Sequence, residues 1–513
     1  MMIRRDFLKL VAASAAVGAV GAGVSGCTGG GGAAGGGGGG ATSLTYGLIS
    51  APMTFDPSRA EWGNRLPYYQ LAYDTLLCAT PEGTIDPWLA TEWSYDDPET
   101  TLTLTIREGV TFSDGASLDA PAVAASLERF KSGGGPDQGY MRYVDTVEAP
   151  DATTVLVHFT QPDPAFLNYL TRTAGLVLSP DAASNPDLDT NPVGSGPYTL
   201  DVGATVTGTS YVFAKREGYW NPDVQHYDTI TLRVFNDPTA TLNALRAGEL
   251  NAAKLQTAEM FSQAESAGWT LNENELDFSG LLLLDRAGTM SEPLGDVRVR
   301  RAINMAFDRE AFLDAVVLGY GTLTEQVFPP ASAAFDASLD TTYGYDPEAA
   351  KALLAEAGYP NGFDLEMPSS ALLGMTTFNL LQQALGDIGI RVSYVDPGQN
   401  FIADLLAPRF AASYMALEQN PDWQLTQFMV SPDAVFNPFQ YADDQVNAWL
   451  EEYLGADATR RDAIMGELNA YLVEQAWFAP FYRITGVVAT DPNTQLAMLP
   501  TNTLPNMYDI KPA

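Results

Sequence analysis

The sequence predicts a mixed α and β protein with more than one lobe, preceded by an export signal and a flexible tether. Three observations support this class. Residues 1–42 have the charge and composition of a leader followed by a coil. Strand patterns dominate the first third of the rest, and helix patterns dominate from residue 296 onward. About 470 residues follow the tether, enough for two or three lobes with cores of their own.

Residues 1–26 have the layout of an export signal, with a charged start and an apolar stretch over residues 10–24. That stretch is too short and too rich in small residues for a membrane span, which needs about 20 mostly apolar residues. Residues 4–9, beginning Arg4-Arg5, resemble the twin-arginine export motif. Residues 24–27 resemble a bacterial lipobox, which predicts lipidation of Cys27 and attachment to a membrane. An ordinary cleaved signal with an incidental cysteine is the alternative.

Residues 27–42 are expected to form a glycine-rich tether. Ten of the twelve residues 29–40 are glycine, so the segment has almost no side chains to bury. A flexible coil of this length spans on the order of 20 Å. The chain is therefore expected to stand a short distance from the membrane.

The composition excludes several classes of partner and site. The formal charge of −36 argues against nucleic acid, because phosphate binding needs clustered Lys and Arg. The same charge favours either cationic ligands or solubility outside the cell. Two histidines, two cysteines and the absence of the common metal and nucleotide motifs predict no metal site and no cofactor.

The strand-rich part begins with residues 101–106, where leucine and isoleucine alternate strictly with threonine. Asp119 can then cap a helix whose inward face carries Val123, Leu127 and Phe130. Residues 154–159 and 229–235 have further strand patterns. A sheet with a helix on its surface is expected here.

The helix-rich part is marked by aspartates at helix starts and glycines after helix ends. Residues 239–247 predict one helix, ended by Gly248. Asp296, Asp308 and Asp346 each precede an apolar periodicity of three and four residues and are predicted N-caps.

Nine segments along the chain form a recognisable series. They are residues 73–77 (YDTLL), 87–93 (PWLATEW), 104–115 (LTIREGVTFSDG), 192–198 (PVGSGPY), 219–220 (YW), 244–249 (ALRAGE), 296–303 (DVRVRRAI), 308–309 (DR) and 346–359. In this order they resemble the peptide/nickel class of solute-binding proteins that serve ABC importers, extracellular solute-binding protein family 5. Residues 192–198 resemble the G-T-G-P-Y block of that family, with Ser195 in place of threonine. The resemblance covers roughly residues 45–485, and most of these motifs serve the scaffold.

The resemblance implies an α/β, two-lobed periplasmic-binding-protein type fold (type II, cluster C) with an extra subdomain. Lobe I is expected to comprise residues 43–75, 193–288 and 482–513. The extra subdomain is expected at 76–192 and lobe II at 289–481. A ligand enclosed between the lobes would stabilise their closure about the crossing strands only by touching both.

The resemblance also suggests which residues face the cleft. The loop at residues 51–56, with Met53 and Thr54, is expected on one wall, and the end of a buried strand places Asp285 and Arg286 at the hinge. Aromatic walls are expected from Trp62, Trp423 and Tyr482, each of which could equally be a core residue.

The opposite wall is expected to come from residues 418–423, where peptide-binding members hold the ammonium group of the peptide with an acidic residue. Their W-x-x-D pattern is replaced here by residues 417–420 (LEQN), which include Glu418 and Gln419 and put the amide of Asn420 at the acidic position. Glu418 or Asp422 could substitute, although Asp422 could instead cap a helix. An oligopeptide is the favoured ligand, with other polar solutes or metal chelates as alternatives.

The predicted function is therefore that of a membrane-anchored, extracytoplasmic solute-binding subunit of an ABC importer, not an enzyme. Its expected partners are a small solute, the ABC permease subunits and, through Cys27, the membrane, and a monomer is expected. A ligand-sensing lipoprotein of the same fold and an exported hydrolase with paired carboxylates are the alternatives.

Overall fold

The computed structural model describes residues 42–96, 99–418, 420 and 422–513. Residues 41–513 form one compact unit. The predictions for residues 1–41, including the export signal, most of the tether and Cys27, lie outside the described residues.

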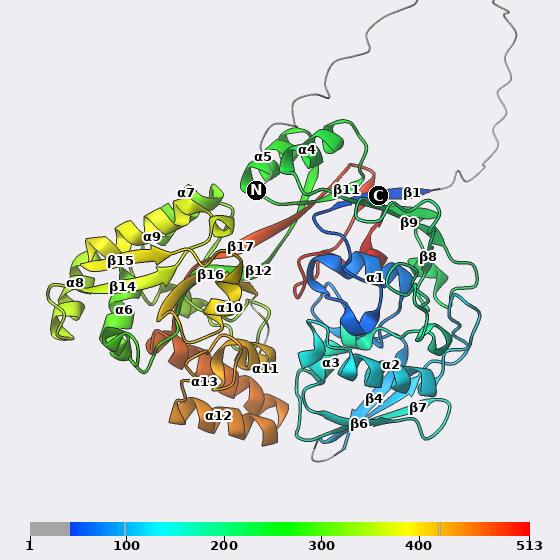
Figure 1. Cartoon of the computed structure of the whole chain (residues 1–513), viewed down its shortest axis with the longest axis horizontal. Helices are drawn as coiled ribbons and strands as arrows, with labels where there is room; N and C mark the ends of the chain where they lie inside the picture. Colours follow the sequence, from blue (N-terminus) through cyan, green and yellow to red (C-terminus); the bar gives the residue numbers. More distant parts are fainter. Residues whose placement is uncertain (1–41, 97–98, 419, 421) are drawn as a thin grey trace, which may run out of the picture. The chain divides into compact units, whose positions relative to one another are not determined.

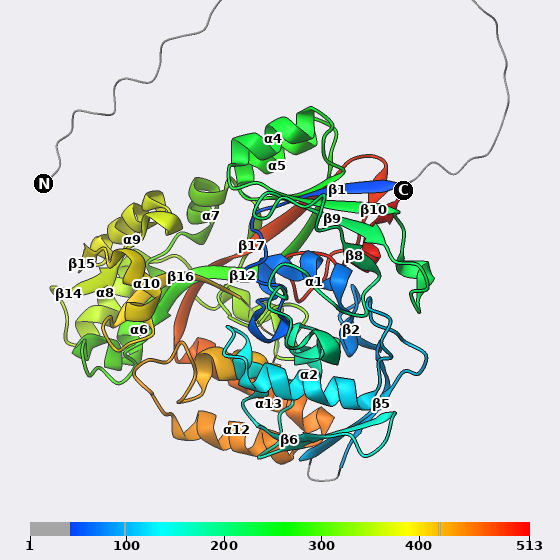
Figure 2. The same ribbon diagram turned by 45° about the vertical axis from the view of Figure 1, so that its right-hand side comes forward.

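A nine-stranded sheet organises this unit, and β12 and β17 run through it as its two longest strands. They pair antiparallel from Thr270↔Thr490 to Leu282↔Phe478, side by side in Figures 1 and 2. The strands follow the order β16 (Ala412–Glu418), β12 (Thr270–Leu283), β17 (Phe478–Thr490), β11 (Ala252–Leu255), β1 (Ser43–Leu48), β10 (Thr229–Val234), β9 (Ser210–Lys215) and β8 (Tyr198–Leu200), and β13 (Gly321–Leu323) also pairs with β17.

Four smaller sheets complete the strands of the described chain. The largest has the order β4 (Ala90–Tyr95), β5 (Thr101–Ile106), β7 (Thr154–Phe159) and β6 (Val144–Glu148), as the alternation over residues 101–106 predicts. The others pair β2 (Leu77–Ala79) with β3 (Ile85–Pro87), β14 (Phe363–Pro368) with β15 (Ile390–Val395), and β18 (Thr494–Gln495) with β19 (Lys511–Pro512).

Four α-helices begin at the capping aspartates predicted from the sequence. Asp119 accepts a hydrogen bond from the Ala122 N–H at the start of α2, and Asp296, Asp308 and Asp346 cap α6, α7 and α8 in the same manner. The helices are α1 (Leu66–Ala72), α2 (Ala120–Ser132), α3 (Phe166–Tyr169), α4 (Pro238–Arg246), α5 (Ala258–Ser266), α6 (Val297–Met305), α7 (Arg309–Val317), α8 (Pro347–Glu356), α9 (Met375–Asp387), α10 (Phe401–Leu405), α11 (Asp422–Leu425), α12 (Asp444–Gly455) and α13 (Ala458–Glu474).

The crossing strands contribute to more than one hydrophobic core. At one end, Val487 and Ala489 of β17 pack with α4, α5 and β11. Toward the other end, Leu281 and Leu283 of β12 and Phe481 of β17 pack with helices α6 to α9. Separate cores therefore meet along one pair of strands, which leaves the middle of that pair available for a site.

The lobe boundaries predicted from the sequence remain a prediction. One core cluster contains residues 76–177 of the expected extra subdomain together with residues of β16, α12 and α13. Another combines β1, α1, β8 to β10 and the C-terminal residues 499–510 with residues 176–188 of the expected extra subdomain.

Candidate functional site

Two adjoining cavities lie against the middle of β12 and β17. They share four lining residues: Asn64, Leu276, Asp277 and Thr503. The acidic cavity, of about 260 Å³, is also lined by Glu61, Trp62, Gly63, Asp137, Tyr140, Arg172, Glu418 and Asn502. The lysine cavity, of about 340 Å³, is also lined by Ile49, Lys254, Leu255, Gln256, Phe261, Asn274, Ile484, Thr485 and Gly486. Segments far apart in the chain thus enclose one continuous site.

A β-bulge in β12 directs its side chains into this site. The pairing with β17 steps from Glu275↔Thr485 to Asp277↔Ile484, so Leu276 is an extra residue without a partner on β17. A bulge places neighbouring side chains where a regular strand would alternate them. Leu276 and Asp277 consequently both line the cavities.

Carboxylates predominate in the acidic cavity. Asp277 of β12 lies directly across from Glu418 of β16 in the sheet. Arg172 Nη1 lies 3.6 Å from Glu418 Oε1, and its Nη2 donates to the Thr501 carbonyl at 3.2 Å. Asp137 Oδ2 accepts from the Trp62 N–H and, at 2.8 Å, from Thr173 Oγ1. Among the described lining residues, Arg172 is thus a single cation with four acids, Glu61, Asp137, Asp277 and Glu418.

Asp277 is the carboxylate of this group without a partner. No ion pair or hydrogen bond reaches its side chain from the residues that the structure describes. Burial and the neighbouring Glu418 raise the pKa of Asp277 to about 6, although Lys254 opposes the shift. Its charge is therefore easily changed near neutral pH.

Lys254 supplies the positive charge of the lysine cavity. Its Nζ donates to the Thr503 carbonyl at 3.1 Å, and within the described chain it has no ion pair. Burial lowers the pKa of Lys254 to about 8, although Asp277 opposes the shift. A Cβ at Gly486 would lie 3.0 Å from this Nζ and 2.8 Å from Asn274 Oδ1, so a glycine keeps the space around the ammonium group open.

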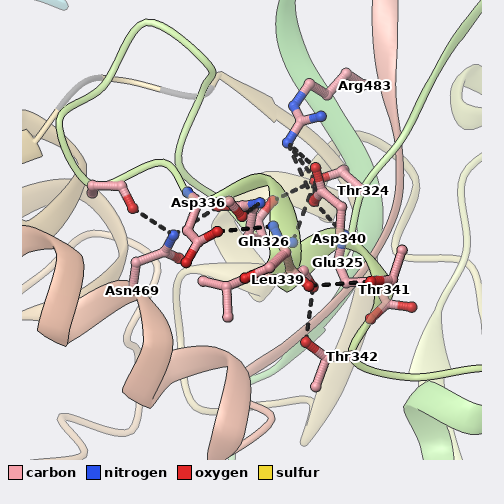
Figure 3. Close-up of polar contacts among 12 residues, drawn as sticks. Thr324, Glu325, Gln326, Asp336, Leu339, Asp340, Thr341, Thr342, Asn469 and Arg483 are labelled. Carbon is pink, nitrogen blue, oxygen red and sulfur yellow. Dashed lines mark hydrogen bonds and ion pairs between the residues drawn. The ribbon is translucent and has the colours of Figure 1, made fainter.

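The β17 wall of the site is fastened on one side by Arg483, the neighbour of cavity-lining Ile484. Arg483 Nη2 donates to Thr324 Oγ1 at 2.7 Å and contacts the Asp340 carboxylate at 3.2 Å (Figure 3). Gln326 of the same loop accepts from Asn469 of α13 at 2.7 Å. This network holds β17 in a fixed position behind the cavities.

Part of the predicted site lies in or beside the acidic cavity. Trp62 and Glu418 line it. Asn420 is buried near the end of β16, and its Oδ1 has no partner among the described residues. Trp423 stacks on Tyr453 at 5.0 Å and, with Asp422, borders a separate cavity of about 90 Å³. Asp422 begins α11 at a φ of 43° and accepts from Ser332 Oγ at 2.6 Å.

The other predicted residues line neither the acidic nor the lysine cavity. Met53 is exposed, and Thr54 donates to Asp189. Asp285 accepts backbone N–H groups from residues 289–291, and Arg286 lies over the Trp477 ring at 4.4 Å. Tyr482 is buried in the core around α6 to α9. The contacts of Thr54, Asp285, Arg286 and Tyr482 are structural. A binding role for these four residues and for Met53 stays a prediction without support from the cavities. Gln419 lies outside the described residues.

The sequence interpretation missed Asp277, Lys254 and Arg172. None lies in a recognisable motif, and each is an ordinary charged residue in its local pattern. One feature of the sequence could have indicated such a site residue: a charged residue inside an apolar strand pattern, as Lys254 is between Ala253 and Leu255.

No group of three or more His, Cys, Asp or Glu side chains in the described chain is arranged to hold a metal ion. No helix there has the length and apolar character that crossing a membrane requires.

Comparison with known proteins identifies relatives along most of the chain. The glutathione-binding protein GsiB of Shigella flexneri serotype 5b is 31% identical over 404 residues, covering 74% of this chain and 77% of that protein. GsiB of Salmonella paratyphi A is 32% identical over 387 residues, covering 71% and 73%. These relatives are named as binding proteins.

Solved structures share the fold over 92% of this chain. HbpA2 of Haemophilus parasuis superposes with a TM-score of 0.79 at 21% identity, over the whole of that chain. NikA of Brucella suis, in complex with Fe(III)-EDTA, gives the same TM-score, identity and coverage. DppA of Helicobacter pylori, in complex with the peptide STSA, gives 0.75 at 21% identity and 98% coverage of that chain. The fold is that of a type II periplasmic binding protein. Because residues 84–446 match the model of the bacterial extracellular solute-binding proteins, family 5, the chain belongs to that family.

Proposed function

We propose that this protein is an exported, lipid-anchored solute-binding subunit of an ABC importer that captures a small peptide-like solute by closure about β12 and β17. The observation that carries the proposal is the pair of adjoining cavities, in which Asp277 and Lys254 face the same space without an ion pair to any described residue. Lys254 is buried and Asp277 is half-buried. Charges withdrawn from water are normally paired, so unpaired ones in a cavity favour a charged ligand.

The arrangement of cores supports hinge closure. β12 and β17 contribute to the core around α4 and α5 at one end and to the core around α6 to α9 at the other. The cavities lie at the bulge between these ends. Bending of two strands between separate cores is a known hinge geometry, and a ligand that contacts both sides favours the closed form.

A peptide-like solute is supported by the relatives and by the cavity. GsiB is named a glutathione-binding protein, and the Helicobacter structure holds a peptide. The two cavities, about 260 and 340 Å³, have the combined size of a small-molecule site. Polar groups of both charge signs and the aromatic rings of Trp62 and Tyr140 line them.

Two parts of the proposal, the membrane attachment and the transport partner, rest on the sequence of residues 24–27 and on the family rather than on the described residues. Residues 24–27 resemble a lipobox, and the glycine tract after Cys27 would serve as a tether. The family supplies a small solute to ABC permease subunits, which are the proposed partners.

The proposed function is tested by measuring ligand binding and the compaction of the protein that accompanies it. Purified full-length protein is titrated with tri-alanine, glutathione and Fe(III)-EDTA by calorimetry, and its radius of gyration is measured by solution scattering with and without each compound. We expect micromolar or tighter binding of a peptide, accompanied by a decrease in the radius of gyration. Binding of the chelate alone would exclude the peptide assignment, and peptide binding without compaction would exclude hinge closure.

A further inference from the structure

We propose, building on the function above, that Asp277 holds the cationic end of the captured solute and Lys254 its anionic end. The site is thereby selective for short zwitterionic solutes whose opposite charges bridge the acidic and lysine cavities. Neither residue belongs to the segment 418–423 from which the sequence predicts the ammonium contact. The bulged strand β12, rather than the turn after β16, supplies the principal acidic group.

The acidic cavity has an excess of negative charge that no described cation balances. Glu61 is paired with Arg65, and Glu418 with Arg172 at 3.6 Å. Asp137 accepts two hydrogen bonds from neutral donors. Asp277 has no such partner, and the sheet places it beside Glu418. A cation between these two carboxylates would relieve their repulsion and neutralise Asp277.

The lysine cavity has the opposite imbalance, because Lys254 has no anionic partner among the described residues. Lys254 can donate three hydrogen bonds, and its one protein acceptor is the Thr503 carbonyl among the residues that the structure describes. A free carboxylate is the acceptor that best satisfies an ammonium group in a confined site. Gly486 preserves the space that such a group would need.

Asp277 and Lys254 do not satisfy each other, which distinguishes them from a structural ion pair. The buried pair Arg309–Glu325 shows what a structural pair looks like in this protein. Its Nη1 and Oε1 lie 3.2 Å apart, and the guanidinium group donates further hydrogen bonds to the Pro480 carbonyl and to Asn304 Oδ1. Between Asp277 and Lys254 no ion pair forms within the described chain. Both residues line the lysine cavity, and Asp277 also lines the acidic cavity.

An unpaired acceptor of the lysine cavity suits the body of a peptide. Asn274 Oδ1 is buried without a partner in the part of the chain that the structure describes, although its Nδ2 donates to the carbonyls of Leu499 and Asn502. It lines the lysine cavity together with Lys254. An amide N–H of the solute is the donor that would satisfy it.

The experiment compares tri-alanine, N-acetyl-tri-alanine and tri-alanine amide with the full-length protein by calorimetry. The variants are Asp277→Asn and Lys254→Met, with Glu273→Gln as the matched control, because Glu273 is an exposed carboxylate of β12 that lines neither cavity. We expect Asp277→Asn to weaken tri-alanine binding by on the order of tenfold or more and to leave the affinity for N-acetyl-tri-alanine unchanged. We expect Lys254→Met to weaken tri-alanine binding by on the order of tenfold or more and to leave the affinity for tri-alanine amide unchanged. Glu273→Gln should change neither affinity.

A second measurement requires no ligand. Because the ionised Asp277 is held unpaired, Asp277→Asn should raise the Tm of the free protein, by on the order of 2 °C near neutral pH, whereas Glu273→Gln should not. A decrease in Tm, or equal weakening of tri-alanine and its N-acetyl derivative by Asp277→Asn, would overturn the assignment. If neither tri-alanine nor glutathione binds the unmodified protein, the peptide form of the proposed function fails, and the Tm comparison still decides whether Asp277 is held without a partner.

Discussion

Acidification from about pH 7 to about pH 5 is expected to weaken tri-alanine binding about tenfold through Asp277, because Lys254, with a pKa of about 8, and the amino group of the peptide stay mostly protonated over this range. Burial and the adjacent Glu418 raise the pKa of Asp277 to about 6. Below that pH the carboxyl group is protonated and loses its attraction for the ammonium group of the solute. At about pH 5 roughly one molecule in ten retains the carboxylate, and the apparent affinity falls by the same fraction. The other charged groups facing Asp277 are Lys254, Arg172, Asp137 and Glu61.

The assay is calorimetric titration at about pH 7, 6 and 5 with unmodified protein, Asp277→Asn and Glu273→Gln. The terminal carboxyl group of the peptide, with a pKa of about 3.5, stays ionised throughout this range. The tenfold decrease should appear in the unmodified protein and in Glu273→Gln and should be absent in Asp277→Asn. A constant affinity in the unmodified protein, or the same decrease in Asp277→Asn, would refute the reasoning.

Three further predictions concern stability and attachment. Arg309→Met should lower the free energy of unfolding by about 3 kcal/mol, because it leaves Glu325 buried without its ion partner. Arg391→Met removes one member of an exposed ion pair and should change the free energy of unfolding little. Urea unfolding measures both variants, and equal effects would contradict the contribution of burial. Asp74→Ala should lower the free energy of unfolding by about 3 kcal/mol or more in the same assay, because the buried carboxylate accepts hydrogen bonds from two tryptophan N–H groups and one tyrosine hydroxyl. A smaller decrease would show that water takes the place of the carboxylate. Cys27→Ser should release the protein from the membrane fraction of cells, and unchanged fractionation would rule out the proposed lipid anchor.

Local sequence patterns predicted the elements well, because capping and periodicity act within a few residues. The carboxylate of Asp119 caps α2, and the apolar face predicted for that helix, Val123, Leu127 and Phe130, is buried. The helix predicted over 239–247 is α4, and Gly248 follows it at a φ of 68°. Such features depend on hydrogen bonds and burial that the segment itself provides.

Prediction of the site was less complete, because several candidates were placed by position in a family pattern. Asp285 and Arg286 do follow a buried strand as expected, yet their polar atoms bind neighbouring backbone and side chains. Trp62 and Glu418 do line the acidic cavity. Sequence position indicates which loop is near a site, but not which way a side chain points.

The sequence by itself determined the elements, their caps and the family, since each is encoded in contiguous residues or in motifs that follow one another in order. Only the tertiary structure decided the charge arrangement of the site. Asp277 and Lys254 lie on strands β12 and β11, which are not neighbours in the sheet, and both flank β17 from distant parts of the chain. Asp277 turns into the cavities because one extra residue, Leu276, bulges from its pairing with β17. A bulge depends on the register between two strands about 200 residues apart, and no local pattern specifies that register.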